Sequence, residues 1–389
     1  MRVIHIITRM IIGGAQENTL FNCLDLHRDY HDDVLLVTGP SLGPEGDLLT
    51  QGRAGDLPIQ LVPELIRAIN PIKDWQALQS LRRAIRSFKP DVVHTHSAKG
   101  GLLGRRAAFQ ERVPVIVHSV HGAPFHPYQS ALARNLFRLC ETKAANWCDR
   151  MISVADAMTD LMVDARVAKP EKFTTIYSGM DVEPFLNAEQ DRDATRASLN
   201  IKPQHVVIGK IARLYHLKGH EDLITAAPAL IASWPQVRFL LVGDGILRAT
   251  LQQRIDSMGL SNHFIFTGLV PPSEVPRMIG AMDALVHTSY REGLARALPQ
   301  ALIAGRPVIS YDIDGAREVT IDNETGFLVP PGDTNRLSQR LIEVVSDRAG
   351  RERMGAAGRD RFTDRFRHQT MTREIRALYE EILRQSARK

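Results

Sequence analysis

Short apolar runs alternate with helical patterns along most of the chain. The runs that we read as strands form two series: 3–8, 34–38, 59–62, 92–95, 115–119 and 151–154, and then 206–212, 239–242, 264–267, 284–287, 308–310 and 326–329. Short runs that are apolar nearly throughout, with helices between them, are typical of parallel strands covered on both faces. The pattern therefore predicts an α/β protein with two parallel sheets.

A polar segment separates the two series. Residues 177–203 contain Glu-Pro-Phe and Asp-Arg-Asp and suit a linker with a short helix. A chain of 389 residues is also too long for one ordinary core. We therefore predict two doubly wound, Rossmann-like domains, residues 1–183 and 184–365, that face each other across a cleft. Because ligands of open α/β sheets bind beyond the carboxyl ends of the strands, each domain is expected to hold one substrate.

Two predicted helices carry apolar stripes. The stripe of the first, over 75–88, lies beside four basic residues and consists of Trp75, Leu78, Leu81, Ile85 and Phe88. Two interpretations stay open for it: an ordinary helix that covers the sheet, or a helix that docks on an anionic bilayer. The stripe of the last helix predicts one buried face and consists of Ile375, Leu378, Tyr379 and Ile382.

Composition narrows the class of protein. Hydrophobic residues make up 44% of the chain and charged residues 24%, which describes a soluble globular protein. Three cysteines provide no disulfide framework and fit a reducing compartment. The first apolar run is interrupted by His5 and ended by Arg9, so it reads as a buried strand rather than a signal peptide. We therefore predict a cytoplasmic protein.

The net charge of +5 is concentrated in two basic stretches. Residues 66–112 hold ten Lys or Arg against three Asp or Glu, and residues 346–389 hold twelve against seven. A basic surface can attract nucleic acid, an anionic membrane or phosphorylated substrates. Neither stretch interleaves aromatics with its charges and no nucleic-acid motif is present, so we predict no nucleic-acid partner. An anionic membrane surface stays a candidate partner, and it would hold the protein on the inner face of the plasma membrane.

The stretch from Ser289 to Asp333 carries most of the functional signal. Glu292-Gly293 follows an apolar run, Gln300 comes eight positions after Glu292, and glycines and prolines recur to the end of the stretch. This stretch resembles the nucleotide-sugar half-site of the retaining glycosyltransferases of family four, which have the GT-B fold. In that family two acidic residues, eight positions apart, grip the sugar nucleotide. Here the first acid is Glu292, but the second position is Gln300.

The resemblance extends over essentially the whole chain and implies an activity. It implies transfer of a sugar, with retention of configuration, from a nucleotide-sugar donor to a saccharide or lipid-linked acceptor in polysaccharide biosynthesis, without a resident cofactor. UDP is the favoured nucleotide of the donor because it is the commonest in this branch. By resemblance, the first domain binds the acceptor and the second the donor, and residues 366–389 form a helix that crosses back onto the first domain.

The resemblance also implies roles for residues of the second domain. Glu292, beside Gly293, would face the donor sugar, Gln300 the ribose, and Gly243 the turn beneath the nucleobase. Arg213 and Lys218 follow the run 206–212 and precede a helix, so both lie on a loop above the sheet edge.

Two cations on this loop would neutralise the charge that develops on a leaving diphosphate. The alternative is a pair of solvated surface charges, but the spacing of Arg213 and Lys218 from the Glu292 segment matches the family and favours the catalytic interpretation.

In the first domain, Gly13 and Gly14 follow the first strand, where backbone amides can hold phosphate or a sugar hydroxyl. A third glycine that would complete a dinucleotide fingerprint is missing, which argues against NAD. Lys99 can bind an acceptor phosphate, although a solvated lysine at a helix start is an equal alternative. By resemblance, His121 lies close to the reacting sugar, and a buried structural histidine is the alternative.

Patterns for a metal site are weak. The pairs at 191/193 and 312/314 match an Asp-x-Asp pattern, but two such pairs are about what chance gives for this composition. His94 and His96 have no cysteine or acid at ligand spacing. We therefore predict no metal.

Two other functions stay open. A nucleotide-sugar 2-epimerase shares the fold, but it needs acid–base residues on both faces of the sugar and no acceptor, which the pattern of Arg213, Lys218 and Glu292 disfavours. A non-catalytic sugar-nucleotide binding protein is kept open by Gln300.

Overall fold

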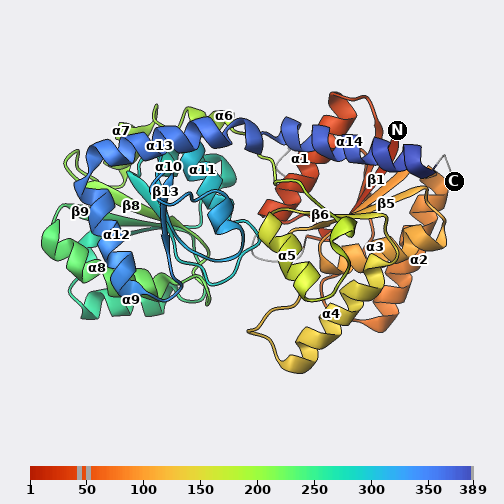
Figure 1. The fold of residues 1–389 in the computed structure, drawn as a ribbon, viewed down its shortest axis with the longest axis horizontal. Coiled ribbons are helices and arrows are strands. Elements are labelled where there is room, and N and C mark those ends of the chain that lie inside the picture. Colours follow the sequence, from red (N-terminus) through yellow and green to blue (C-terminus); the bar gives the residue numbers. More distant parts are fainter. Residues whose placement is uncertain (42–45, 50–53, 387–389) are drawn as a thin grey trace. The chain divides into compact units, whose positions relative to one another are not determined.

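The computed structural model describes residues 1–41, 46–49 and 54–386, and the chain divides into two compact units (Figure 1). Unit 1 contains residues 1–180 and the segment that begins at residue 365, and unit 2 contains residues 181–364. The boundary at residue 181 falls inside the polar segment 177–203. The last three residues of the predicted segment 366–389 lie outside the described residues.

Unit 1 is built on a parallel sheet of seven strands in the order β3-β2-β1-β4-β5-β6-β7. Its strands are β1 (Arg2–Arg9), β2 (Asp33–Gly39), β3 (Ile59–Leu61), β4 (Val92–His96), β5 (Val115–Val120), β6 (Arg150–Ser153) and β7 (Phe173–Thr175). Its helices are α1 (Gly14–Arg28), α2 (Pro71–Phe88), α3 (Ala98–Gln110), α4 (Ala131–Ala145), α5 (Asp156–Asp164) and α14 (His368–Ser386). The strands β4 and β5 are buried along their whole length, as strands covered on both faces must be.

Unit 2 repeats the design with a parallel sheet of six strands in the order β10-β9-β8-β11-β12-β13. Its strands are β8 (Val206–Ile211), β9 (Val237–Val242), β10 (Phe264–Gly268), β11 (Ala284–His287), β12 (Val308–Tyr311) and β13 (Gly326–Val329). Its helices are α6 (Glu183–Leu186), α7 (Arg192–Ser198), α8 (His220–Ser233), α9 (Arg248–Ser257), α10 (Val275–Gly280), α11 (Ala297–Ile303), α12 (Thr334–Ser346) and α13 (Arg348–Phe362).

The last helix, α14, returns to unit 1 and packs along α1, as predicted. Its apolar face is buried in the core of unit 1, together with residues of β1 and α1. Polar contacts fix the register of the two helices: Thr372 donates a hydrogen bond to Asp25 (2.8 Å) and accepts one from Asn22 (3.1 Å). The buried face predicted from the stripe is therefore confirmed.

The stripe of α2 is mostly buried as well. Leu78, Leu81 and Ile85 are buried, whereas Trp75 keeps 62% of its surface exposed. The helix begins with Asn70, whose side chain caps the backbone amide of Lys73. The interpretation of this helix as a cover for the sheet therefore agrees with the structure. Among the described residues, no helix combines the length and the apolarity that crossing a bilayer requires.

Each sheet contains one point at which the strand order reverses. In unit 1 this switch point lies between β1 and β4, and in unit 2 between β8 and β11. Loops that leave adjacent strands in opposite directions open a crevice at the carboxyl ends, where ligands of doubly wound sheets bind. The predicted residues Arg213, Lys218 and Glu292 follow β8 and β11, and Gly13 and Lys99 follow β1 and β4.

Candidate functional site

At the switch point of unit 2, the loop after β8 meets the loop after β11. The ammonium group of Lys218 lies 2.5 Å from a carboxylate oxygen of Glu292, and both side chains are about four-fifths buried. Arg213, on the same loop as Lys218, is exposed and places its guanidinium group 5.1 Å from the centre of the Tyr215 ring. A predicted cation and the predicted acid are thus in direct contact.

The loop between Arg213 and Lys218 is held close to the end of β11. Gly219, the residue before α8, has φ +61°, and a Cβ there would lie 2.0 Å from the carbonyl oxygen of Thr288. Only glycine tolerates this approach without displacing the strand. The ring of His220 also contacts the carbonyl oxygen of Arg213 at 3.0 Å. Backbone packing therefore fixes the loop from which the side chains of Arg213 and Lys218 extend.

The environment of Glu292 keeps its carboxyl group ionised. Burial alone would raise the pKa of Glu292, but the charges and hydrogen-bonding groups of His287 and Lys218 outweigh burial and lower the pKa below its usual value. His287 approaches Glu292 to 3.5 Å, which is an electrostatic contact rather than a good hydrogen bond. An ionised carboxylate only accepts hydrogen bonds, so Glu292 suits recognition of hydroxyl groups.

A buried lysine lies beneath this pair. Lys210, on β8, is fully buried and donates a hydrogen bond to the hydroxyl group of Thr288 (2.7 Å), which donates in turn to the carbonyl of Gly219 (2.6 Å). Burial, together with the charge of Lys218, lowers the pKa of Lys210 to about 7. Lys210 is not among the residues predicted from the sequence, although a lysine within the otherwise apolar strand β8 was the available signal.

The loop that carries Glu292 and Gly293 is fastened to the loop after β12. The backbone amide of Glu292 donates to Asp314 (2.6 Å), and the amide of Gly315 donates to the carbonyl of Gly293 (3.2 Å). Asp314, at φ +42°, and Asp312, which pairs with Arg317, form one of the two Asp-x-Asp pairs. Both carboxylates therefore have structural partners in the described chain.

Gly243 and Gln300 complete the residues predicted in unit 2. Gly243 follows β9 with φ +138°, and a Cβ there would lie 2.2 Å from the carbonyl oxygen of Ala212. The turn after β9 thus contacts the start of the loop that carries Arg213. Gln300 is half-buried on α11, the helix that follows Glu292. Five of the six predicted residues lie on the loops after β8, β9 and β11, and Gln300 lies on the helix after them.

The predicted residues of unit 1 follow the carboxyl ends of β1, β4 and β5. Gly13 precedes α1 and Gly14 begins it. Lys99 forms an ion pair with Asp74 of α2 (2.6 Å) and also donates to the carbonyl of Ala68. These partners support a structural role for Lys99 rather than a free phosphate ligand. His121 lines a cavity of about 270 Å³ together with Ser97, Ser119 and neighbouring residues.

A chain of hydrogen-bonded histidines leads from this cavity into the core of unit 1. His121 contacts His96 at 3.2 Å, and His96 contacts His5 at 3.0 Å. His94 lies beside them and bridges Tyr379 of α14 (2.5 Å) and Ser119 (2.8 Å). Burial lowers the pKa of His5 to about 3, and it lowers the pKa values of His94 and His96 well below the usual value. These three rings are therefore neutral at physiological pH.

The nitrogens of His5, His94 and His96 lie within 4.8 Å of one another, close enough to suggest a metal centre. The rings of His5 and His96, however, stack with planes only 16° apart. One nitrogen of His5 and one nitrogen of His96 are hydrogen-bonded to each other at 3.0 Å, so these two atoms already have partners. Both nitrogens of His94 also have hydrogen-bond partners. The geometry favours a hydrogen-bonded chain, and the absence of a metal stays a prediction.

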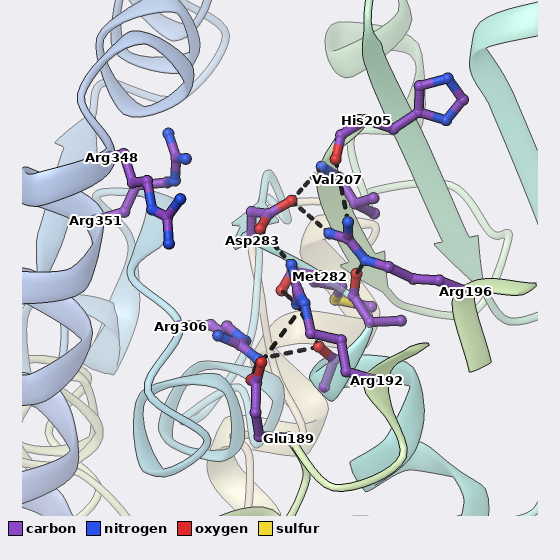
Figure 2. Close-up of polar contacts among 12 residues, drawn as sticks. Glu189, Arg192, Arg196, His205, Val207, Met282, Asp283, Arg306, Arg348 and Arg351 are labelled. Atoms are coloured by element: carbon purple, nitrogen blue, oxygen red, sulfur yellow. Dashed lines mark hydrogen bonds and ion pairs between the residues drawn. The ribbon is translucent and has the colours of Figure 1, made fainter. Parts of the chain in front are cut away.

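A second polar cluster of unit 2 lies at the opposite edge of the sheet, before β11 (Figure 2). Asp283 accepts hydrogen bonds from Arg192 (2.5 Å), Arg196 (2.7 Å) and the backbone amide of Val207 (2.7 Å). Arg192 also donates to the carbonyls of residues 280 and 282, and Arg196 to those of 281 and 205. The cluster therefore fastens α7 to the central strands.

Both halves of the chain match models of known domains. Residues 13–179 match a glycosyl transferase 4-like domain, and residues 191–361 match glycosyl transferases group 1. A GDP-mannose-dependent alpha-mannosyltransferase of Mycobacterium tuberculosis is 30% identical over 353 residues, which are 87% of this chain and 85% of that protein. The UDP-Gal:alpha-D-GlcNAc-diphosphoundecaprenol alpha-1,3-galactosyltransferase of Escherichia coli is 28% identical over 351 residues, or 90% of this chain and 89% of that one.

Solved structures agree on the fold. Anabaena HepE, crystallised in complex with UDP, matches this chain with a TM-score of 0.82 at 21% identity, over 98% of this chain and 100% of that one. The family and the GT-B fold predicted from the stretch between Ser289 and Asp333 are thereby confirmed. A relative is 30% identical over 87% of this chain, and the two halves of the chain match a glycosyl transferase 4-like domain and glycosyl transferases group 1. This chain therefore belongs to the group 1 glycosyltransferases.

Proposed function

We propose that this glycosyltransferase moves a sugar, with retention of configuration and without a metal ion, from a UDP-sugar to a saccharide or lipid-linked acceptor in cell-surface polysaccharide biosynthesis. The observation that carries the proposal is the contact of Lys218 with Glu292, on the loop shared with Arg213, at the switch point of unit 2. This arrangement offers cations for a diphosphate and an ionised carboxylate for sugar hydroxyls.

In the proposed reaction, the bond between the anomeric carbon and the diphosphate oxygen breaks while the acceptor hydroxyl attacks from the same face. Negative charge grows on the leaving diphosphate, and Arg213 and Lys218 stabilise it. The acceptor proton passes to the departing phosphate oxygen, so no carboxylate nucleophile is needed. The lowered pKa of Glu292 keeps its carboxylate ionised near neutral pH. Glu292 can therefore accept hydrogen bonds from the donor sugar, and it does not act as an acid.

Ion pairing prepares Lys218 for the donor. Glu292 occupies one direction around the ammonium group at 2.5 Å, and an ammonium group has three hydrogens to donate. The remaining hydrogens can contact a diphosphate while the carboxylate keeps the side chain in place. A side chain that is already positioned loses little conformational freedom when the donor binds, which favours catalysis.

Two comparisons support the choice of donor and acceptor. The Escherichia coli relative uses UDP-galactose and an undecaprenol-linked acceptor by its name, and the Anabaena structure contains UDP. The Mycobacterium tuberculosis relative is GDP-mannose-dependent, so the base is the part of the proposal most in need of a test. The cavity beside His121 in unit 1 is the candidate position for acceptor groups near the reacting sugar. Lipid-linked acceptors would hold the protein at the inner face of the plasma membrane.

Incubation with nucleotide sugars tests the proposal. Thermal-shift screening against UDP-, GDP- and ADP-sugars identifies the donor, and we expect stabilisation by a UDP-sugar. Addition of lipid-linked or soluble saccharide acceptors should then release free UDP and yield a product with the anomeric configuration of the donor. Formation of a C2 isomer without acceptor would identify an epimerase instead. Binding with neither reaction would identify a non-catalytic binding protein.

A further inference from the structure

A cavity of about 480 Å³ lies in unit 2, beside the ion pairs of Asp283. Its lining comes from α7, from α13 and from the segments that lead into β8, β11 and β12, so it lies at the edge of the sheet opposite the proposed donor site. Cavities of this volume accommodate small-molecule ligands. Five arginines line it, and we call it the arginine cavity: Arg192, Arg196, Arg306, Arg348 and Arg351.

Carboxylates compensate most, but not all, of this positive charge. The acidic residues of the lining are Glu189, Asp193, Asp283 and Glu352. Asp283 and Glu189 each form ion pairs with two of the arginines, and Glu352 pairs with Arg348. Because five arginines face four carboxylates, the lining keeps a positive balance. Such a balance in a concave site attracts anions.

Arg351 carries the part of the charge that no carboxylate of the described chain pairs with. Its Nη1 group donates to the carbonyl oxygens of Val344 (2.6 Å) and Val345 (2.7 Å), and these contacts hold the side chain in place. A guanidinium group has five N–H donors, so Nε and Nη2 are still available to an acceptor. Figure 2 shows Arg351 and Arg348 directed from α13 toward the residues around Asp283, with no dashed line between them and that group. Burial lowers the pKa of Arg351, so an anion would stabilise its charged form.

Arg306, which enters the cavity from the segment before β12, is also short of partners. Its Nη2 group donates to Glu189 and to the carbonyl oxygen of Gly280 (3.0 Å). Its Nε is buried without a hydrogen-bond partner among the residues that the structure describes. Burial, and then the charge of Arg192, lowers the pKa of Arg306. Two arginines on different elements of the fold thus face one cavity with hydrogen-bonding capacity that the protein does not use.

We propose that the arginine cavity binds the phosphoryl group of a small molecule, which Arg306, Arg348 and Arg351 hold. Guanidinium groups donate paired hydrogen bonds to phosphate oxygens, a match that a lysine does not provide. The cavity has room for more than a phosphoryl group, so the rest of a phosphorylated metabolite fits as well. The site lies away from Lys218 and Glu292, and it does not rest on the proposed function.

Isothermal titration calorimetry of the purified full chain, in a buffer free of phosphate and sulfate, tests the proposal. The probes are orthophosphate and glycerol 3-phosphate, which carries a phosphoryl group but neither the sugar nor the base of a nucleotide-sugar donor. We expect saturable binding that weakens as salt is raised. Arg351→Met should bind at least about tenfold more weakly, because it removes a charged hydrogen-bond donor.

Two further variants separate binding from folding. Arg351 also contacts the end of α12, so Arg348→Met is the second test: the Arg348 side chain is 84% exposed, which makes a contribution to folding small. It should bind about threefold or more weakly with an unchanged melting temperature. Arg353→Met is the matched control, because Arg353 is an exposed arginine of α13 that does not line the cavity, and it should bind like the wild type.

The two probes also distinguish the source of the phosphoryl group. Equal affinities would identify free phosphate as the ligand, and tighter binding of glycerol 3-phosphate would identify a phosphorylated metabolite; both results support the proposal. Binding of neither probe at millimolar concentration would overturn it and leave the arginines with a structural role. Wild-type affinity in both Arg351→Met and Arg348→Met would overturn it as well. Loss of binding in Lys218→Ala, with the cavity variants unaffected, would assign the anion to the proposed donor site instead.

Discussion

Lys210 and Lys218 lie eight positions apart on β8 and the loop that follows it, at the proposed donor site, but burial gives them different chemistry. Lys218 lies on the loop after β8 and is paired with Glu292, which compensates its positive charge. The hydrogens of the ammonium group that do not contact Glu292 can still contact an anion. Lys210 is fully buried, with a hydroxyl group as its hydrogen-bond partner, and its pKa is about 7. At the residue scale, Lys218 therefore suits the proposed contact with the donor, whereas the pKa of Lys210 is lowered to about 7 by burial.

The depressed pKa of Lys210 predicts a pH dependence of stability. The unfolded chain holds the Lys210 proton up to about pH 10, and the folded chain releases it near pH 7. Between these values the unfolded state binds more protons, so the contribution of Lys210 to the free energy of unfolding rises with pH. Lys210→Met should therefore stabilise the protein most at or below pH 7, and this advantage should shrink by about 2 kcal/mol at pH 9. Urea denaturation of both proteins at the two pH values measures it, and an advantage that stays constant would contradict the depressed pKa.

Gln300 is the departure from the family pattern, and it predicts weaker but intact donor binding. A carboxylate can accept charge-assisted hydrogen bonds from both ribose hydroxyls, whereas an amide turns one of its ends into a donor. The loss amounts to about 1–2 kcal/mol in nucleotide affinity. Gln300→Glu should then tighten donor binding about five- to thirtyfold in isothermal titration calorimetry. Weaker binding would show that position 300 does not face the ribose.

At the scale of elements, strand order explains why the residues of the proposed donor site meet. The loops after β8 and β11 belong to strands that are neighbours in the sheet but far apart in sequence, and they bring Lys218 to Glu292. The opposite edge of the same strands is fastened by Asp283, which binds the guanidinium groups of Arg192 and Arg196. One edge of the sheet therefore holds the proposed donor site, and the other edge holds the ion pairs of Asp283.

Removal of Asp283 should destabilise unit 2. Asp283→Ala leaves Arg192 and Arg196 largely buried without their carboxylate, and breaking such a pair costs about 3–5 kcal/mol. Glu352→Ala is the control, because Glu352 and its partner Arg348 are mostly exposed and an exposed pair contributes at most about 1 kcal/mol. Chemical denaturation compares the two variants. Equal stabilities would mean that the cluster is not the fastening that the geometry suggests.

Apolar runs predicted most of the strands, because a parallel strand that is covered on both faces consists mostly of apolar residues. The strand β7, Phe173–Thr175, was missed, since three residues that include two threonines give no such run. The sequence predicted Lys218 and Glu292 as site residues, but it did not predict that their side chains are in direct contact. The roles of Lys210 and Asp314 were missed because they depend on burial and on a positive φ, which a motif does not encode.

The cluster of His5, His94 and His96 could not be assembled from the sequence. His94 and His96 were considered as metal ligands, but His5 joins them from a strand about ninety positions away. The parallel pairing of β1 with β4 places His5 opposite His94. Such long-range contacts follow from strand order, which the spacing of residues along the chain does not reveal.

At the scale of the whole molecule, the proposed chemistry uses fixed cations in place of a divalent ion. Transfer should therefore proceed at an unchanged rate in excess EDTA, because Arg213 and Lys218 supply the positive charge that a metal would supply. Rates measured with and without EDTA, in buffers treated to remove metals, check this. Complete loss of activity that manganese restores would contradict it.

The rate of acceptor-dependent nucleoside diphosphate release, measured side by side for the wild type, Lys218→Ala and Arg213→Ala, tests the central claim most directly. Each substitution removes a contact that strengthens as the diphosphate leaves, worth about 2–4 kcal/mol, so each rate should fall about thirty- to several-hundredfold. Lys202→Ala, an exposed lysine of unit 2, serves as the control and should keep the wild-type rate. Near-native release by both Lys218→Ala and Arg213→Ala would contradict the assignment of this crevice as the donor site.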